Sequence, residues 1–403
     1  MKKIFDICKN IAPIHISDYS TLSDYTAFLN ASVFVNTNNE PTFKNIDLLF
    51  HNNKLVAIDF VKDDFCLDNI KFKVVDAKNM YITPSFIDQH IHGGYDVNFH
   101  NSNEEQIRYF LKKSAEYGYS YIVATLLPDS ITNINKQLGV INNIINFPDT
   151  GATKILGVHL EGPFFNPQKA AIHPAKLLIK PNINDFQKIN NKNIIKIITL
   201  APELDENYEL CEFLNKNNII PSAGHSIASA QEIQDSKVKQ ITHLFNAMAS
   251  IHHRKLTIAN EALSNDDLFI ELITDLKHVH PKMLNFVRKL KPKHKIIFIS
   301  DALPCAYSKN NIFYMNDVKI DTSSGLALGE DGTIAGNNKF SCDNIKQILN
   351  ETDFTFEEII ASLSINCAKN LNIENKFEFK LHNTLDFIIW NKKTLEIEKI
   401  YLS

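Results

Sequence analysis

The middle of the chain alternates short apolar segments with helical ones, and this repeat restricts the fold more than any other feature of the sequence. The apolar segments predict eight strands that end near His92, Leu127, Glu161, Ala201, His225, His243, His278 and Asp301. Between them, apolar residues recur at helical spacing, as in 134–145 and 283–290. Eight strands that alternate with helices over about 220 residues predict a (β/α)8 TIM barrel. A doubly wound open sheet is the alternative, because strand order cannot be read from the sequence.

One helix start is predicted in detail. The run Ser102-Asn-Glu-Glu105 has the pattern of a capping box. Ile107 and Phe110 follow it on one helical face, and Gly118 lies where the helix should stop.

Both ends of the chain predict β-structure instead. Short β-like runs occur at 31–35, 46–50, 55–58 and 72–75, and matching runs occur at 385–390 and 395–401. Unpaired strand edges tend to find partners, so both ends should form one small β-sandwich beside the barrel. The predicted domains are 28–83 and 375–403 for the sandwich and 84–374 for the barrel. Residues 1–27 form an N-terminal segment whose role the pattern does not indicate.

Composition limits the class of partner and the compartment. The chain has 403 residues and a formal charge of −4, which argues against a nucleic-acid or an anionic-membrane partner. Its six cysteines have no paired spacing, which is typical of reduced thiols in the cytoplasm. Asp6 and Lys9 interrupt any apolar core of a signal peptide, and no run approaches the roughly 18 apolar residues of a membrane helix. We therefore expect a cytoplasmic globular enzyme.

The strongest chemical signal is the run Pro84-Ser-Phe-Ile-Asp-Gln-His-Ile-His-Gly-Gly94. An apolar strand, predicted over 81–87, leads into His90 and His92, which share a face because they are two residues apart. The two glycines then allow a sharp turn. Two imidazoles at a strand end are half of a transition-metal site. A hydrogen-bonded pair that merely packs is the alternative for an isolated His-X-His.

Further strand ends carry metal-binding or acid–base side chains, namely those of Glu161, His225, His243, His278 and Asp301. In a barrel these ends meet at one mouth, so the set predicts a metal site there. His159, on the same face as Glu161 but deeper, is predicted to be structural. The strand that ends Thr199-Leu-Ala-Pro-Glu203 has no lysine for carbamylation, which favours Glu161 as a bridging carboxylate.

Five segments carry a resemblance to known proteins: Pro84–Gly93, His159–Phe164, Pro221–Ser226, Thr242–Met248 and Ser300–Ala302. Later, Asp331–Gly336 and Asn366–Lys369 fit the same pattern. Together they resemble the amidohydrolase superfamily and, within it, the N-acetylglucosamine-6-phosphate deacetylases. The segments at 159–164 and 242–248 are specific to the deacetylases, whereas His-X-His is shared across the superfamily.

The resemblance implies hydrolysis of the acetamide of N-acetylglucosamine 6-phosphate to glucosamine 6-phosphate and acetate, with one or two divalent ions, zinc or iron. It makes Glu161, His225 and His243 the principal metal ligands. Asp301 becomes the catalytic acid–base, and His278 would contact the acetamide carbonyl.

The same resemblance implies a substrate site. Asn246 and Ala247 would meet the phosphate through side chain or backbone, and His173 would contact the sugar. Arg254 matches a phosphate-binding arginine that in this family reaches in from a neighbouring subunit, which implies a homodimer. After this arginine the chain has Lys255-Leu-Thr-Ile, where an acidic-Pro-Gly run is expected. Two further departures are at Ser85 and Ala171, each in place of a glycine.

Two questions stay open at this point. Because both His90 and His92 are present, Glu161 could join a His90/His92 ion, completed by Asp301, to a His225/His243 ion. The alternative is one ion, with the His-X-His pair hydrogen-bonded nearby.

The function also has alternatives. Another amidohydrolase, such as a deaminase or a cyclic-amide hydrolase, would have no use for Arg254 or the Asn246–Ala247 pair. A non-catalytic barrel scaffold should have lost a ligand or Asp301, and none is missing.

Overall fold

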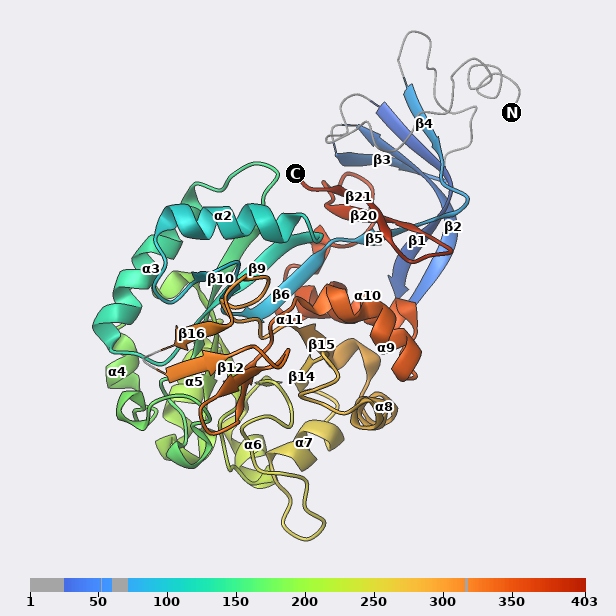
Figure 1. Ribbon diagram of the computed structural model, residues 1–403. Coiled ribbons are helices and arrows are strands. Elements are labelled where there is room, and N and C mark those ends of the chain that lie inside the picture. Colours follow the sequence, from blue (N-terminus) through green and yellow to red (C-terminus); the bar gives the residue numbers. More distant parts are fainter. Residues whose placement is uncertain (1–24, 52, 60–71, 316–317) are drawn as a thin grey trace.

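The computed structural model describes residues 25–51, 53–59, 72–315 and 318–403. They form a large unit of strands and helices with a small β-domain beside it (Figure 1). Of the predicted N-terminal segment 1–27, residues 1–24 lie outside the described residues, and the last three begin a strand. No helix in the described part is both long and apolar enough to cross a membrane.

Eight parallel strands form the sheet of the large unit, and they neighbour one another in chain order. They are β6 (Phe86–Ile91), β9 (Tyr119–Leu126), β10 (Lys154–Glu161), β11 (Ile195–Leu200), β12 (Ile220–Ala223), β13 (Gln240–Ile241), β14 (Phe269–Ile273) and β15 (Ile296–Ile299). Just beyond β15 the N–H of Asp301 donates to the carbonyl of His90 at 2.9 Å, and the N–H of Ser300 donates to Asp88 at 3.1 Å. These bonds tie the eighth strand end to the first, and the predicted (β/α)8 barrel is confirmed.

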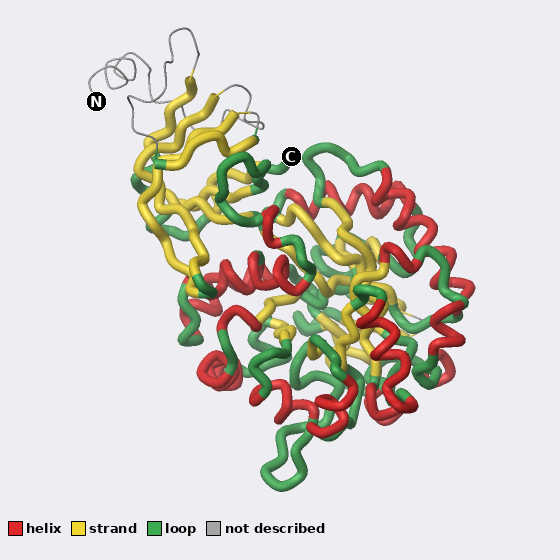
Figure 2. The backbone as a smooth tube through the Cα atoms, turned by 180° about the vertical axis from the view of Figure 1, so that it is seen from behind, coloured by secondary structure: helices red, strands yellow, loops and turns green. Residues whose placement is uncertain are grey.

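Helices cover the outside of this barrel (Figures 1 and 2). They are α2 (Glu104–Ala115), α3 (Ile131–Asn146), α4 (Ile183–Gln187), α5 (Glu209–Lys216), α6 (Ala230–Ser236), α7 (Ile258–Ser264), α8 (Pro281–Leu290), α9 (Ile345–Glu351), α10 (Phe356–Leu363) and α11 (Ile365–Asn370). Short 3₁₀ turns are η2 (Pro167–Lys169), η3 (Ala175–Leu177), η4 (Lys192–Ile194), η5 (Pro202–Leu204), η6 (Glu206–Tyr208), η7 (Lys293–Lys295), η8 (Ser341–Asn344) and η9 (Glu374–Lys376). In α3 the buried residues Ile134, Leu138 and Ile141 recur every three or four positions, which places one apolar stripe against the sheet.

The start of α2 differs from the prediction by one residue. Asn103, and not Ser102, is the N-cap: its side chain accepts from the N–H of Gln106 at 3.0 Å, and the Gln106 side chain accepts from the N–H of Asn103 at 2.9 Å. The Ser102 hydroxyl instead accepts from the N–H of Asn98 at 3.0 Å. Because that hydroxyl is engaged in the preceding turn, the next residue caps the helix.

Strands from both chain ends form one seven-stranded sheet. They are β1 (Tyr25–Thr37), β2 (Glu40–His51), β3 (Lys54–Ile58), β4 (Phe72–Asp76), β5 (Met80–Pro84), β20 (Phe387–Asn391) and β21 (Ile397–Tyr401). Since β20 pairs antiparallel with β5, the C-terminal hairpin completes the sheet that the N-terminal strands begin. Phe28, Phe50 and Phe387 form its aromatic core, with ring centroids 4.9–6.0 Å apart. The predicted small β-domain from both chain ends is confirmed.

The apolar run 81–87, predicted as one strand, is two. Strand β5 ends at Pro84 in the small domain, and β6 begins at Phe86 in the barrel. Between them Ser85 is buried, with its hydroxyl 2.6 Å from that of Ser120. The run is continuously apolar because it is buried first in one sheet and then in the other.

Two small antiparallel sheets follow barrel strands, and the sequence pattern did not predict them. One pairs β7 (Gly93–Gly94) with β8 (Val97–Asn98) directly after β6. The other contains β16 (Ile312–Met315), β17 (Val318–Asp321), β18 (Ala327–Gly329) and β19 (Ile334–Gly336), drawn in orange after β15 (Figure 1).

Candidate active site

A cavity of about 440 Å³ opens at the C-terminal ends of the barrel strands. Strands β16 and β19 contribute Met315 and Ile334 to its wall. Its lining includes nine of the predicted site residues: His92, Glu161, His173, His225, His243, Asn246, Ala247, His278 and Asp301. The mouth of the barrel therefore gathers residues that are up to about two hundred positions apart in the chain.

Glu161, the last residue of β10, is buried at the centre of this group. Its Oε1 lies 3.3 Å from Nε2 of His225 and 3.1 Å from Nε2 of His243, and these two nitrogens are 3.1 Å apart. Nδ1 of His225 donates to the carbonyl of Lys169 at 2.8 Å, and Phe165 stacks on the same imidazole with centroids 3.9 Å apart. Because a carbonyl can only accept, the proton of a neutral His225 is on Nδ1 and its Nε2 presents a lone pair to the carboxylate.

His90 and His92 approach the same carboxylate from the end of β6. Nε2 of His90 is 3.4 Å from Oε1 of Glu161 and 3.4 Å from Oδ1 of Asp301. Nε2 of His92 is 3.2 Å from Oε2 of Glu161 and 3.3 Å from Oδ1 of Asp301. Both imidazoles thus point to one side, as their spacing in the strand predicts.

This donor set fits a divalent transition metal. Within the described ranges, Nε2 of His90 is buried without a hydrogen-bond partner, although carboxylate oxygens face it. A lone pair that faces carboxylate oxygens in a buried site is unfavourable unless a proton or a metal cation lies between them. Two groups that share Glu161 have ligand atoms within 4.8 Å of one another, Glu161/His225/His243 and His90/His92/Glu161. Imidazole and carboxylate donors suit zinc and iron.

The buried charges also shift pKa values. Burial disfavours a charged imidazole, but the carboxylates around His90 outweigh it and raise its pKa well above the usual value. Burial alone would raise the pKa of a carboxyl group, but His90 and the other imidazoles hold the pKa of Glu161 well below its usual range. The pKa of Asp301 is lowered in the same way by His90 and His92. Both carboxyl groups are therefore ionised at neutral pH.

Three residues at the mouth have left-handed backbone conformations. The φ angles are +48° at His225, +29° at His243 and +50° at Asp301, each just beyond the end of a barrel strand. Such conformations cost of order 1–3 kcal/mol for a residue other than glycine. Ala171, which replaces a glycine of the resembled family, also has a positive φ of +52° and lines the cavity. The cavity wall thus includes several residues with strained backbone, although positive φ angles also occur elsewhere in the chain.

His278 was predicted to lie at the end of its strand, and this prediction is wrong. Strand β14 ends at Ile273, and His278 lies on the loop that follows. Its Nδ1 donates to Oδ2 of Asp275 at 2.7 Å, while Oδ1 of Asp275 accepts from the N–H groups of Lys277 and His278 at 2.9 Å. Burial lowers the pKa of an imidazole, but Asp275 outweighs it and raises the pKa of His278. A hydrogen bond within the loop, rather than the sheet, therefore positions this side chain.

Known proteins match both this sequence and this fold. The model of the amidohydrolase family matches residues 81–401. The chain belongs to the amidohydrolase family. It is similar to the N-acetylglucosamine-6-phosphate deacetylase of Bacillus subtilis (strain 168), with 30% identity over 305 residues, 72% of this chain and 76% of the relative. It is also similar to the enzyme of the same name from Lysinibacillus sphaericus, with 26% identity over 328 residues, 80% and 84% of the two chains.

The fold is shared with a solved structure. The crystal structure of N-acetylglucosamine-6-phosphate deacetylase from Thermotoga maritima matches this amidohydrolase with a TM-score of 0.80 at 24% identity, covering 93% of this chain and 98% of that one.

The loop after β13 brings a backbone donor of this amidohydrolase to the cavity. The side-chain amide nitrogen of Asn246 donates to the carbonyls of His243 and Leu244 at 3.1 and 3.3 Å, so it fixes the turn. The neighbouring Ala247 has a positive φ of +46°, and its N–H meets no acceptor among the residues that the structure describes. The sequence predicts contact with the phosphate through a side chain or through the backbone. The Asn246 amide is engaged in the turn, so the backbone N–H of Ala247 is the donor that is available.

His173 lies in the same wall as His225. It is buried, and burial lowers its pKa to about 3, so it is neutral at ordinary pH. Its ring centroid is 5.2 Å from that of His225. A neutral imidazole here can both donate to and accept from a sugar hydroxyl.

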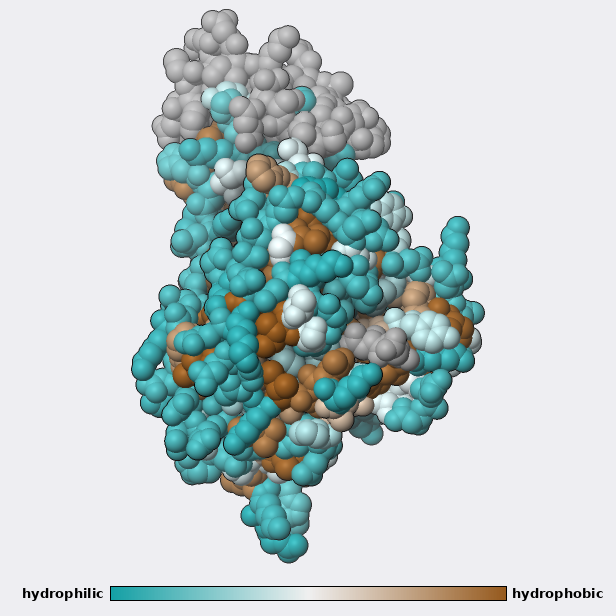
Figure 3. Space-filling view, turned by 90° about the vertical axis from the view of Figure 1, so that its left-hand side faces the viewer, coloured by the Kyte–Doolittle hydropathy of each residue, from teal (hydrophilic) through white to brown (hydrophobic). Residues whose placement is uncertain are grey.

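Arg254 does not line the cavity of its own chain. It lies on the loop between β13 and α7, which protrudes from the barrel and has a hydrophilic tip (Figures 1 and 3). His252 orders this loop, because its Nδ1 accepts from the N–H groups of Arg254 and Lys255 at 3.1 and 2.9 Å. The Arg254 guanidinium is exposed and forms no ion pair with any residue of the described ranges.

Two acidic residues near the site were missed by the sequence reasoning. Asp275 precedes His278 by three positions, a spacing that suits a loop hydrogen bond. Glu271 is the single charged residue in the apolar run Phe269–Ile273. A charge in an otherwise buried strand was the sequence signal that could have identified it. His159, predicted to be structural, is buried beneath the ligands, with Nε2 2.6 Å from the Thr199 hydroxyl.

Proposed function

We propose that this amidohydrolase hydrolyses the acetamide of N-acetylglucosamine 6-phosphate to glucosamine 6-phosphate and acetate. The observation that carries the proposal is one cavity lined by the Glu161/His225/His243 ligand group, Asp301 and His278. Relatives named for this reaction align with most of the chain and support it.

Two ions, zinc or iron, are expected in each chain. Glu161, His225 and His243 would hold one, and His90 and His92 the other, with Glu161 shared and Asp301 completing the latter. When bound, such ions lower the pKa of water towards about 7 and polarise a carbonyl group.

The number of bound ions per chain is tested by elemental analysis of protein loaded with excess zinc or iron. Two ions per chain are expected, and one should remain after His90→Asn is combined with His92→Asn. One ion per chain that this double substitution leaves unchanged would contradict the assignment.

Asp301 moves the proton in the proposed mechanism. It starts as a carboxylate, because the neighbouring imidazoles lower its pKa. It takes a proton from the attacking water and returns it to the departing nitrogen, since an amide nitrogen leaves only after protonation. Asp275 raises the pKa of His278 and accepts from its Nδ1–H, so the protonated imidazole still has Nε2–H to donate to the acetamide oxygen as negative charge develops there.

Phosphate recognition uses the loop after β13 and a second copy of the chain. The Ala247 N–H, which meets no acceptor among the described residues, lies beside the cavity, and Asn246 holds the turn that presents it. Arg254, exposed on its protruding loop, would reach the phosphate of a neighbouring copy in a homodimer. His173 contacts the sugar. The expected location of an enzyme that acts on such a phosphorylated sugar is the cytoplasm.

The proposed reaction is tested by acetate release from metal-loaded protein. The substrates are N-acetylglucosamine 6-phosphate, its unphosphorylated form and the 6-phosphate of the galactosamine epimer. The phosphorylated sugars should give the higher kcat/KM, and their ratio identifies the epimer. Absence of acetate from every sugar, with ammonia or ring-opened product released from amino-heterocycles or cyclic amides, would favour the deaminase or cyclic-amide alternative.

A further inference from the structure

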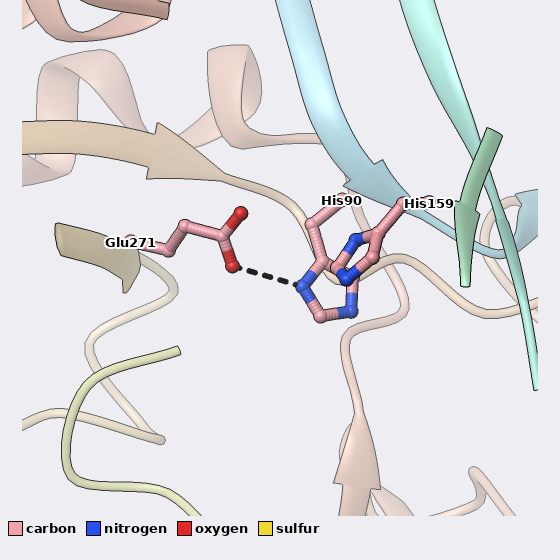
Figure 4. Close-up of side chains that lie close together, drawn as sticks. All are labelled: His90, His159 and Glu271. Carbon is pink, nitrogen blue, oxygen red and sulfur yellow. Dashed lines mark hydrogen bonds and ion pairs between the residues drawn. The ribbon is translucent and has the colours of Figure 1, made fainter. Parts of the chain in front are cut away.

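Glu271 lies directly beneath the predicted metal ligands, in the middle of β14. Its side chain is fully buried and points to His90, as Figure 4 shows. Oε2 lies 3.0 Å from Nδ1 of His90 and also accepts from the backbone N–H of His243 at 3.3 Å. A carboxylate in the barrel interior therefore contacts residues from both predicted ion sites.

Two amide side chains hold the other oxygen of Glu271. Oε1 accepts from Nε2 of Gln89 at 2.7 Å and from Nε2 of Gln240 at 2.8 Å. The Asn370 amide donates in turn to the carbonyl oxygens of both glutamines. Glu271 thus has four hydrogen-bond donors, about as many as two carboxylate oxygens can accept. The network orients the carboxylate from below and leaves it acceptor-only.

This arrangement decides which nitrogen of His90 can bind a metal. A carboxylate accepts and does not donate, so the proton of a neutral His90, the form that can bind a metal, is on Nδ1. Nε2 then carries the lone pair, and this is the atom 3.4 Å from Glu161 and Asp301. In metal sites, such a carboxylate beneath a ligating histidine fixes both the tautomer and the ring orientation.

A direct metal-binding role for Glu271 is the competing interpretation. His90, His159 and Glu271 have ligand atoms within 4.8 Å of one another, and Figure 4 shows the three side chains together. However, Glu271 already accepts four hydrogen bonds, and Nδ1 of His90 is one of its donors. An ion at this position would have to displace those donors, so the contacts favour a positioning role.

We propose that Glu271 is a positioning residue for the ion held by His90 and His92. The proposal rests on the metal-dependent function proposed above. Loss of the carboxylate should lower the affinity for this ion by about 10–100-fold, the usual effect of removing such a partner. The ion held by Glu161, His225 and His243 should keep its affinity.

The test is Glu271→Gln in the full-length protein, with metal binding as the readout. The substitution puts an NH₂ group in place of one oxygen. Facing His90, that group would move the imidazole proton to Nε2 and remove the lone pair; facing Gln89 and Gln240, it would oppose their N–H groups. The matched control is Glu261→Gln, since Glu261 is also buried but is hydrogen-bonded to Gln234 and Asn265 rather than to a predicted metal ligand.

Metal-free proteins are titrated with Co²⁺, whose visible spectrum reports each filled site, and zinc retention is measured against a chelator. We expect two equivalents in the unmodified and control proteins. The Glu271→Gln protein should bind one equivalent normally and the second 10–100-fold more weakly. If that protein does not fold, Glu271→Asp serves, because it keeps the charge but retracts the oxygen from His90.

Three outcomes would overturn the proposal: unchanged affinity for both equivalents, an equal loss of both, or a third equivalent in the unmodified protein that disappears in the variant. The last would make Glu271 a ligand. Because binding is measured without substrate, a protein that binds the ions as expected but releases no acetate refutes the proposed reaction and not the role of Glu271.

Discussion

Asp301→Asn tests the proton-transfer step with little change of shape. The side chain is buried, and Oδ1 lies 3.4 and 3.3 Å from Nε2 of His90 and His92. An amide oxygen can stay there, but an amide cannot take a proton from water and return it. Loss of a general acid–base typically costs 10²–10⁴ in rate, which corresponds to about 2.7–5.5 kcal/mol of activation free energy. We expect at least a roughly hundredfold fall in turnover.

The assay is acetate release at saturating substrate, with metal content measured on the same sample. Glu161, His225 and His243 are unchanged, so this ion should be retained. The control is Asp205→Asn: this buried aspartate accepts from the N–H groups of the helix at 209–216 and does not line the cavity. Its turnover should be normal. Near-normal turnover of Asp301→Asn with full metal content would refute the role of Asp301.

Three further predictions concern the substrate, the pH profile and stability. Arg254→Ala should raise KM far more for the phosphorylated sugar than for the plain one, because a guanidinium holds phosphate through two hydrogen bonds. Mixing it with Asp301→Asn protein should restore some activity through hybrid dimers, whereas equal losses for both sugars would contradict the assignment. Because Asp275 raises the pKa of His278, activity that needs protonated His278 is lost as pH rises through that raised value. Asp275→Asn should therefore move the alkaline limb of kcat/KM to lower pH, and an unmoved limb would exclude this role. Phe387→Ala, in the core of the small domain, should lower the free energy of unfolding in urea by roughly 3–5 kcal/mol; a loss below 1 kcal/mol would contradict the packing of that core.

The barrel was predictable because its signals are local. Each strand is a short apolar run and each helix an apolar stripe, so the alternation is legible without any long-range contact. The polar residue that ends a run is visible for the same reason. This is why Glu161, His225 and His243 could be named in advance and are found together at one mouth. The small β-domain was predictable because short β-like runs occur at both chain ends and need partners.

Loop positions and buried hydrogen bonds were less predictable. His278 was placed at a strand end, but β14 stops at Ile273, and a bond to Asp275 positions the imidazole. The run 81–87 was predicted as one strand because burial in two different sheets leaves the same apolar pattern as burial in one.

The sequence alone determined the barrel, the small domain and the set of candidate metal ligands at the strand ends, since these depend on periodicity and residue type. Only the tertiary structure decided how those side chains are held. Glu271 reaches His90 across 181 positions of the chain and Gln89 across 182. No local pattern encodes such a pair, because the contact exists only after β6 and β14 have both taken their places in the closed barrel. The left-handed turns at His225, His243 and Asp301 are likewise stabilised by the surrounding fold, which supplies the energy that the isolated residues lack.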